Sequence, residues 1–153
     1  MTGHSKLLGP LLFGTLLQCA LGHAAGPAAV DGARLGKAAS QPGQWLTVGR
    51  TTDEQRFSPL KQIDTDNVKQ LSLAWYMDFD SNRGQEATPL AIDGVLYFST
   101  AWSKVKAVDA RTGKLLWAYD PKVPGEFAGR GCCDLVNRGV AAWKGRIYVS
   151  TYD

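Results

Sequence analysis

The sequence predicts an all-β protein that forms part of a β-propeller. From Gln44 onward, short runs of β-branched and aromatic residues alternate with turn residues, which is typical of strands joined by tight turns. Similar segments recur at residues 94–100 (GVLYFST) and 145–151 (GRIYVST), and Trp75 and Trp117, 42 residues apart, each lie near the end of an apolar run. A unit that recurs every 40–50 residues or so indicates propeller blades, because one four-stranded sheet cannot bury both faces alone. The alternative is an unrelated β-sandwich with chance similarities.

The expected strands follow one another at short intervals. An apolar run at residues 71–77 comes first, and residues 66–71 are a weak helical candidate. Asp93-Gly94 is a residue pair that two-residue hairpin turns prefer, and Lys144-Gly145 marks a second tight turn. The remaining expected strands are residues 87–92, 95–100, 105–109, 114–119, 139–143 and 146–151.

These segments make up about one and a half blades. One whole blade runs from Ala87 to Asp120, with an orphan strand before it and half a blade after it. An open arc of blades exposes unpaired strand edges, so we expect residues 45–153 to be the amino-terminal part of a larger, truncated propeller. Residues 26–44 are rich in Ala, Gly and Pro and are expected to form a flexible leader.

The amino terminus has the features of an export signal. Lys6 is followed by an apolar stretch at residues 7–17 and then by small residues, which predicts a cleaved signal peptide at residues 1–25 and a periplasmic protein. The apolar stretch is shorter than the roughly 20 residues that cross a bilayer, so we expect no membrane span. The alternatives are a buried helix and a lipoprotein site at Cys19.

Composition excludes several classes of function. The chain is 44% hydrophobic and 20% charged, and its net charge of +3 comes from scattered Lys and Arg residues. A nucleic-acid-binding protein would gather these residues in a patch, so no nucleic-acid partner is expected. Both histidines, His4 and His23, lie in the predicted signal peptide. The mature chain therefore has no His for a Ser-His-Asp triad or a His-ligated metal.

The adjacent cysteines Cys132 and Cys133 are the most specific feature. They lie in residues 125–139, a long loop for a connection between strands, and long loops on rigid scaffolds often carry functional sites. Adjacent Cα atoms are about 3.8 Å apart, below the usual span of a disulfide, so a bond between these cysteines would be strained. Such strain persists only where the surroundings enforce it, which points to a functional site. The alternative is two free or intermolecularly paired thiols.

Three motifs resemble those of the pyrroloquinoline quinone (PQQ)-dependent alcohol dehydrogenases, which include the methanol and quinohaemoprotein enzymes. Residues 131–139 (GCCDLVNRG) are similar to that family's vicinal-disulfide motif. Residues 82–90 (NRGQEATPL) resemble its first-blade segment, and residues 107–117 (AVDARTGKLLW) resemble its tryptophan docking motif. The similarity runs from about Trp45 to Asp153.

The resemblance implies an eight-bladed propeller with a site for PQQ, a flat tricarboxylate quinone. It implies that Cys132 and Cys133 form a disulfide that packs against one face of the PQQ ring. Arg138 matches a PQQ-contacting arginine, and its charged, planar guanidinium suits carboxylate or quinone oxygens. Glu86 matches a glutamate that hydrogen-bonds the cofactor, at an electrostatic cost unless a donor intervenes.

Other functional parts are expected beyond Asp153. By resemblance these are the catalytic aspartate, the calcium ligands and the tryptophan on the other face of PQQ, so we expect neither a catalytic residue nor a metal ligand in this chain. It contains no Cys-x-x-Cys-His motif, and a haem c domain further along is left open. Trp75 and Trp117 are expected to pack between blades. The segments around Arg83 and at residues 100–104 favour the quinohaemoprotein type.

The expected function is PQQ-dependent oxidation of small alcohols to aldehydes in the periplasm, with electrons passed to a cytochrome c. This chain alone is expected to be inactive. One alternative is a non-catalytic propeller scaffold of the cell envelope, which would share the tryptophan repeat without needing the Cys pair. The other is a PQQ sugar dehydrogenase of the same fold, in which the thiols take no part in activity.

Overall fold

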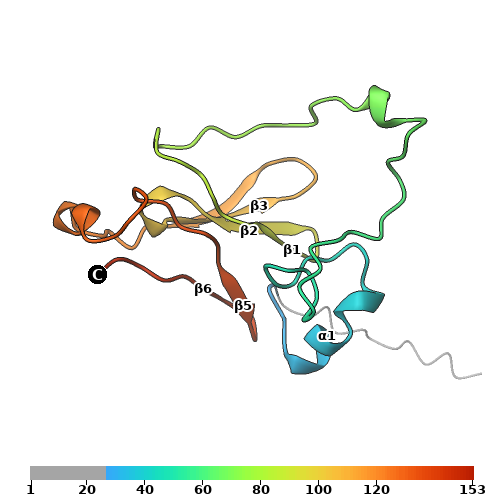
Figure 1. Cartoon of the computed structure of the whole chain (residues 1–153), viewed down its shortest axis with the longest axis horizontal. Helices are drawn as coiled ribbons and strands as arrows, with labels where there is room; N and C mark the ends of the chain where they lie inside the picture. The colour runs from blue at the N-terminus through green and yellow to red at the C-terminus, as the bar shows by residue number, and fades with distance from the viewer. Residues whose placement is uncertain (1–26) are drawn as a thin grey trace, which may run out of the picture.

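One complete four-stranded blade forms the centre of the structure. The computed structural model describes residues 27–153, and it contains an antiparallel sheet with the strands in chain order (Figure 1). This sheet confirms the whole blade predicted between Ala87 and Asp120. Its strands are β1 (Leu90–Ile92), β2 (Val95–Ser99), β3 (Val105–Asp109) and β4 (Leu115–Tyr119).

The turns form where the sequence predicts them. Asp93 and Gly94 both have positive φ angles, 52° and 81°, as the two-residue turn between β1 and β2 requires. After β3, Asp109 Oδ1 accepts hydrogen bonds from the backbone N–H groups of Arg111 (3.1 Å) and Thr112 (2.8 Å). The side chain of Asp109 thereby closes the turn that leads into β4.

Half of a second blade packs against the first. Strands β5 (Ala141–Trp143) and β6 (Arg146–Tyr148) form an antiparallel hairpin that turns at Lys144 and Gly145, where φ is 46° and 78°. Ala142 of β5 is buried in the same hydrophobic cluster as residues of β1 and β2, and Ile147 of β6 packs against it. The prediction of about one and a half blades is confirmed.

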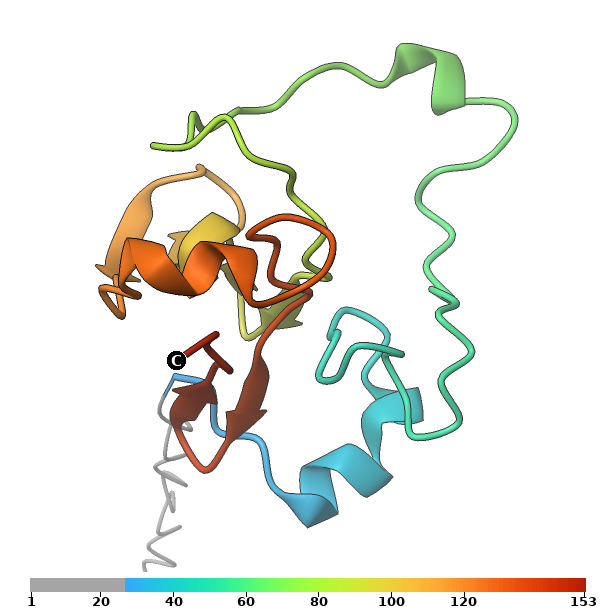
Figure 2. The ribbon, with the colours of Figure 1, turned by 60° about the vertical axis from the view of Figure 1, so that its left-hand side comes forward.

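Residues 27–44 have a defined fold, in place of the flexible leader that their composition favours. They contain α1 (Gly32–Gly36) and a 3₁₀ turn at Ala38–Ser40, and they lie beside the β5–β6 hairpin (Figure 2). The N–H of Lys144 donates to the carbonyl of Val30 at 2.7 Å. Ala28, Val30 and Ala38 are buried in the hydrophobic cluster that also contains residues of β1, β2 and β5.

An ion pair fastens this amino-terminal segment to the first blade. The guanidinium of Arg34 donates to both carboxylate oxygens of Asp93, at 2.7 and 2.8 Å, and also to the carbonyl of Ala29 at 3.1 Å. The hydrogen bond from Arg34 lowers the pKa of Asp93 below its usual value. This two-point contact joins residues that are distant in sequence and holds α1 against the β1–β2 turn.

The strand predicted at residues 71–77 is absent. Within residues 27–153 this stretch pairs with no other strand, and Leu71, Leu73 and Tyr76 are exposed. A strand needs a neighbouring backbone to satisfy its N–H and C=O groups, and none lies alongside here. The weak helical candidate at residues 66–71 forms only a 3₁₀ turn at Val68–Gln70.

Trp75 nevertheless fastens this extended segment to the first blade. Its indole Nε1 donates to the carbonyl of Ala110 at 3.1 Å. The ring lies directly over Gly113, where an added Cβ would approach the ring to 2.6 Å and where φ is +70°. Gly113 therefore permits both the turn conformation and the close approach of the indole.

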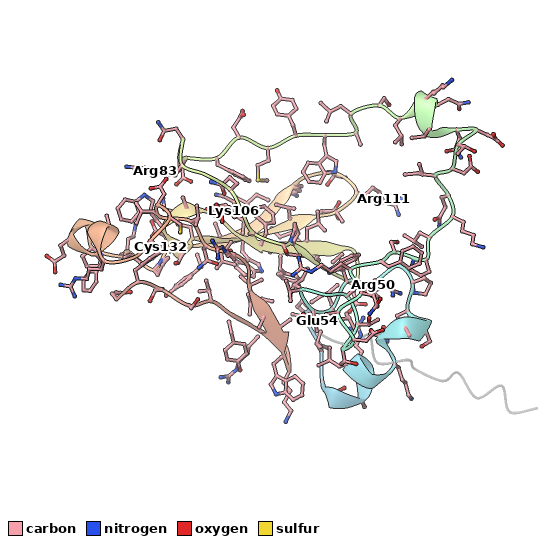
Figure 3. The ribbon with its side chains drawn as sticks, in the orientation of Figure 1. Arg50, Glu54, Arg83, Lys106, Arg111 and Cys132 are labelled. Atoms are coloured by element: carbon pink, nitrogen blue, oxygen red, sulfur yellow. The ribbon has the colours of Figure 1, made fainter. Side chains whose placement is uncertain are left out.

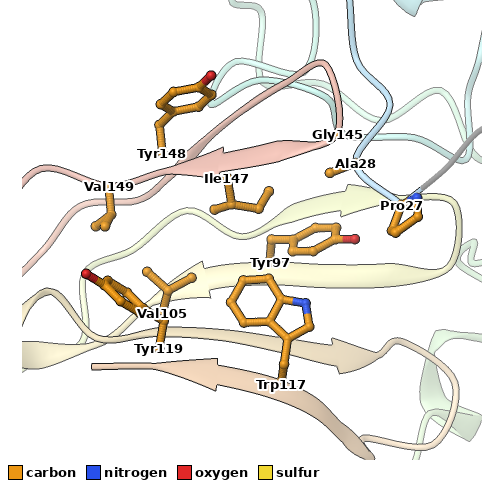
Figure 4. A pocket seen from close by; sticks show the side chains of 10 residues that line it. All are labelled: Pro27, Ala28, Tyr97, Val105, Trp117, Tyr119, Gly145, Ile147, Tyr148 and Val149. Atoms are coloured by element: carbon orange, nitrogen blue, oxygen red, sulfur yellow. The ribbon is translucent and has the colours of Figure 1, made fainter. Parts of the chain in front are cut away.

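Trp117 lines an apolar groove between the two blades (Figure 4). Its ring lies 6.0 Å from that of Tyr97, centroid to centroid, on the face of the sheet that Ile147 of β6 approaches. The two predicted inter-blade tryptophans thus have different surroundings. Trp75 contacts a turn, whereas Trp117 contributes to the groove wall.

The predicted signal peptide at residues 1–25 lies outside the described residues, as does Cys19. In the described part of the chain, every helix is too short or too polar to traverse a lipid bilayer.

Replacement of Gly113 by alanine in the full-length protein should lower the free energy of unfolding by about 2–4 kcal/mol, since left-handed strain adds to the clash with Trp75. Gly94→Ala is the matched control, because φ is +81° there and nothing lies within 4 Å of the added Cβ. The control should cost only about 1–2 kcal/mol. Equal losses in urea unfolding would show that Trp75 does not press on Gly113.

Candidate functional site

A contact between the two blades brings the predicted site residues together. Thr88 and Gly139 form an isolated parallel bridge, and the N–H of Thr88 donates to the carbonyl of Arg138 at 3.2 Å. Because Glu86 precedes Thr88 by two residues, this register places its side chain beside Arg138. Two segments that are far apart in the sequence thus meet at one edge of the molecule.

Glu86 and Arg138 form an ion pair. Arg138 Nε donates to Glu86 Oε2 at 3.1 Å, with the two side chains 71% (Arg138) and 45% (Glu86) exposed. This hydrogen bond raises the pKa of the guanidinium further above its usual value, so Arg138 stays charged. The pairing lowers the electrostatic cost of placing the Glu86 carboxylate beside an anionic cofactor, because that carboxylate already has a cationic donor.

Cys132 and Cys133 lie at the exposed surface of the loop, with their Sγ atoms 2.6 Å apart. The predicted disulfide between them stays a prediction. The backbone is unusual here, because Cys133 and Asp134 both have positive φ angles, 71° and 67°. Two consecutive left-handed residues that are not glycine are costly, and such conformations cluster at functional sites.

The hydrogen bond with Cys132 raises the pKa of the Cys133 thiol, and the nearby Arg138 opposes this shift. A raised pKa keeps the thiol protonated at neutral pH, whereas a nucleophilic cysteine needs a lowered pKa. The arrangement therefore does not favour Cys133 as a nucleophile.

Buried and hydrogen-bonded residues hold the loop that carries the cysteines. Leu135 is almost fully buried, and its carbonyl accepts from the N–H of Trp102 at 3.0 Å. Tyr152 Oη lies 3.0 Å from the carbonyl of Asp134 and 3.2 Å from that of Val136. These contacts fix the backbone directly after the cysteine pair.

A surface ion pair adds a link to the segment before β1. Arg83 Nη1 lies 2.9 Å from Asp134 Oδ1. Figure 3 shows Arg83 and Cys132 at the same end of the molecule. Sequence reasoning assigned no role to Asp134 or Tyr152. Asp134 does fall inside the motif at residues 131–139, but nothing local marks Tyr152.

Three of the four predicted site residues line a small hollow, which can cover only part of a ligand the size of PQQ. The hollow has a volume of about 170 Å³ and is lined by Cys132, Cys133, Val136, Arg138 and Tyr152. Sulfur and Val136 offer a soft, apolar surface for a flat ring, and the Arg138 Nη atoms have no hydrogen bond within residues 27–153. Those free donors match a carboxylate or a quinone oxygen. The residues present therefore fit one edge and one face of this cofactor.

Within residues 27–153, no three His, Cys, Asp or Glu side chains are arranged to hold a metal ion.

Fold and site together define a propeller blade with an adjacent-cysteine loop at its edge. Residues 45–152 match the family described as PQQ glucose/ethanol/alcohol dehydrogenase, β-propeller domain. The chain belongs to this family.

Its relatives include the dehydrogenase subunit of a quinone alcohol dehydrogenase from Komagataeibacter europaeus, 64% identical over 73% of this chain and 15% of the relative. A 1-butanol dehydrogenase (cytochrome c) from Thauera butanivorans is 50% identical over 72% of this chain and 16% of the relative. The chain thus spans about a sixth of the length of these curated relatives.

Solved structures show the same similarity. The quinohemoprotein alcohol dehydrogenase ADH-IIG of Pseudomonas putida is 56% identical, with a TM-score of 0.80 over 82% of this chain and 18% of that chain. A europium-containing methanol dehydrogenase is 34% identical, with a TM-score of 0.72 over 78% of this chain and 21% of that chain. The prediction of a partial β-propeller is confirmed.

Replacement of Tyr152 by phenylalanine in the full-length protein should loosen the cysteine loop, because the hydroxyl that donates to the Asp134 and Val136 carbonyls is lost. The loss corresponds to about 1 kcal/mol, or roughly fivefold faster hydrogen exchange of amides at residues 131–139. Tyr76→Phe is the control, since Tyr76 is 74% exposed. Unchanged exchange in Tyr152→Phe would remove Tyr152 as an anchor.

Proposed function

We propose that this chain is the amino-terminal part of a PQQ-dependent alcohol dehydrogenase that oxidises small alcohols to aldehydes. The names of its relatives support an alcohol as substrate, and the name of the Thauera butanivorans protein includes cytochrome c. We accordingly propose a cytochrome c as the electron acceptor. The signal-like sequence at residues 1–25 supports export to the periplasm.

The meeting of Glu86 and Arg138 beside the cysteine pair carries this proposal. The charged guanidinium of Arg138, with free Nη donors, and the two sulfurs line one hollow, and the Glu86 carboxylate pairs with that guanidinium. A non-catalytic scaffold would need none of these groups at this edge, although it would need the Trp75 contact. The arrangement therefore favours an enzyme over the scaffold alternative.

The chain's own residues would bind and orient the cofactor. When bound, PQQ would supply the redox chemistry by taking up the two electrons and two protons that the alcohol loses as it becomes an aldehyde. Arg138 would hold an anionic oxygen of the ring system, and Glu86 would fix the direction of the guanidinium. The cysteine pair, joined as a disulfide, would cover one ring face and exclude water from it.

Further parts of the proposed enzyme lie outside these residues. We propose that calcium and the catalytic base are held by later blades, since the relatives are several times longer than the segment that they share with this chain. A haem c domain is compatible with the quinohemoprotein names among the relatives. A PQQ sugar dehydrogenase differs in substrate and in making no use of the thiols.

The Arg138→Ala variant of the full-length protein, reconstituted with PQQ and Ca²⁺, should bind PQQ about 10- to 100-fold more weakly, because a charge-assisted hydrogen bond is lost. Arg111→Ala is the matched control, since Arg111 lies exposed in the β3–β4 turn, and its affinity should stay within about twofold. A fluorescence titration with PQQ measures the affinity of both variants. Failure of the wild-type protein to bind PQQ would overturn the proposed function.

The exported protein should carry a disulfide between Cys132 and Cys133, so that its intact mass rises by about 2 Da on reduction. Replacing both cysteines by serine should weaken PQQ binding and lower alcohol turnover by tenfold or so, because the polarisable cover over the ring is lost. Alcohol turnover that survives both reduction and the serine replacements would contradict this role of the disulfide, whereas turnover of a sugar in place of an alcohol, unaffected by reduction, would favour the sugar dehydrogenase alternative.

A further inference from the structure

Asn137 is the buried polar residue at the centre of the loop's attachment. The residue is 8% exposed, and both polar atoms of its side chain hydrogen-bond to protein atoms. Asn137 Nδ2 donates to Ser103 Oγ at 3.0 Å and to the carbonyl of Ser150 at 2.9 Å. Asn137 Oδ1 accepts from the N–H of Gly139 at 3.1 Å. One amide thus joins the β2–β3 connection, the chain after β6 and the end of the cysteine loop.

The bond to Gly139 closes a turn around Arg138. Asn137 and Gly139 flank Arg138, and this contact between a side chain and the backbone two residues on holds the intervening residue in one conformation. The carbonyl of Arg138 is also fixed, by the N–H of Thr88 at 3.2 Å. The backbone of Arg138 is therefore anchored on both sides.

The side chain of Arg138 has little anchoring of its own. It is 71% exposed, and within the described residues its one hydrogen bond is to Glu86, which is itself partly exposed. Exposed ion pairs hold a side chain weakly, because solvent screens the attraction and both side chains lose freedom. The direction of the guanidinium consequently depends on the backbone beneath it.

We propose that Asn137 is a positioning residue, which orients Arg138 toward the cofactor through the turn that it closes at Gly139. This inference rests on the proposed function, because it assigns Asn137 a part in PQQ binding. Asn137 acts through Arg138 and has no direct contact with the cofactor. Its two Nδ2 hydrogen bonds fasten the turn to Ser103 and Ser150. Its Oδ1 hydrogen bond to the N–H of Gly139 sets the direction in which the Arg138 side chain leaves the backbone.

The test is a double-mutant cycle on PQQ affinity in the full-length protein. Asn137→Ala should weaken PQQ binding by about tenfold, because the turn around Arg138 opens. In the Arg138→Ala background, Asn137→Ala should change affinity by less than about threefold, since the group that it positions is gone. A residue that only stabilises the fold would give losses that multiply.

Asn137→Ser supplies the rescue. A serine hydroxyl can also accept from an N–H two residues on, so this variant should keep the turn while losing both contacts of Nδ2. It should bind PQQ at least about threefold more tightly than Asn137→Ala, although both variants lose thermal stability. Asn67→Ala is the matched control, because Asn67 also bonds to backbone groups but lies far from the site in an exposed loop.

The outcomes separate the two proposals. If wild-type protein binds PQQ and the losses from Asn137→Ala and Arg138→Ala multiply, the inference about Asn137 fails while the proposed function stands. If Asn137→Ser binds no better than Asn137→Ala, the inference fails as well. Absence of PQQ binding by the wild-type protein overturns the proposed function and the role of Asn137 together.

Discussion

The register between the first blade and the second depends on the short parallel contact of Thr88 with Gly139. Gly139 has a φ of +144°, and a Cβ there would lie 3.3 Å from the carbonyl oxygen of Thr88. A residue with a Cβ would be strained at this φ and would press on the Thr88 carbonyl, so glycine favours the close contact. Because Glu86 and Arg138 extend from these two segments, their pairing follows from this backbone contact.

The site consists of buried residues that anchor the loop and exposed residues that carry the chemical groups. Leu135 and Asn137 are buried and tie the loop to neighbouring elements, whereas Cys132, Cys133 and Arg138 face outward. An exposed ion pair contributes only about 0–1 kcal/mol, so it cannot by itself fix the geometry of a binding site. Precision at the exposed groups therefore comes from hydrogen bonds in the protein interior.

The amino-terminal segment completes the hydrophobic core between the two sheets. Val30 and Ala38 fill the space beside β1 and β5, and the pairing of Arg34 with Asp93 closes this side of the core. The segment contains Ala, Gly and Pro, which are common in flexible linkers and equally suited to narrow gaps. Composition alone does not distinguish a flexible linker from a segment packed in the core. The difference depends on the strands of the two sheets, which lie elsewhere in the chain.

The sequence by itself determined the blade, its turns and the loop with the cysteine pair. Turn residues such as Asp93-Gly94 and Asp109 set the conformation of the residues next to them. The alternation of apolar and polar side chains along a strand is equally local. Only the tertiary structure decided that Glu86 meets Arg138, that residues 27–44 fold into the core and that residues 71–77 form no strand. Each of these depends on which distant backbone lies alongside, and short-range patterns carry no information about that.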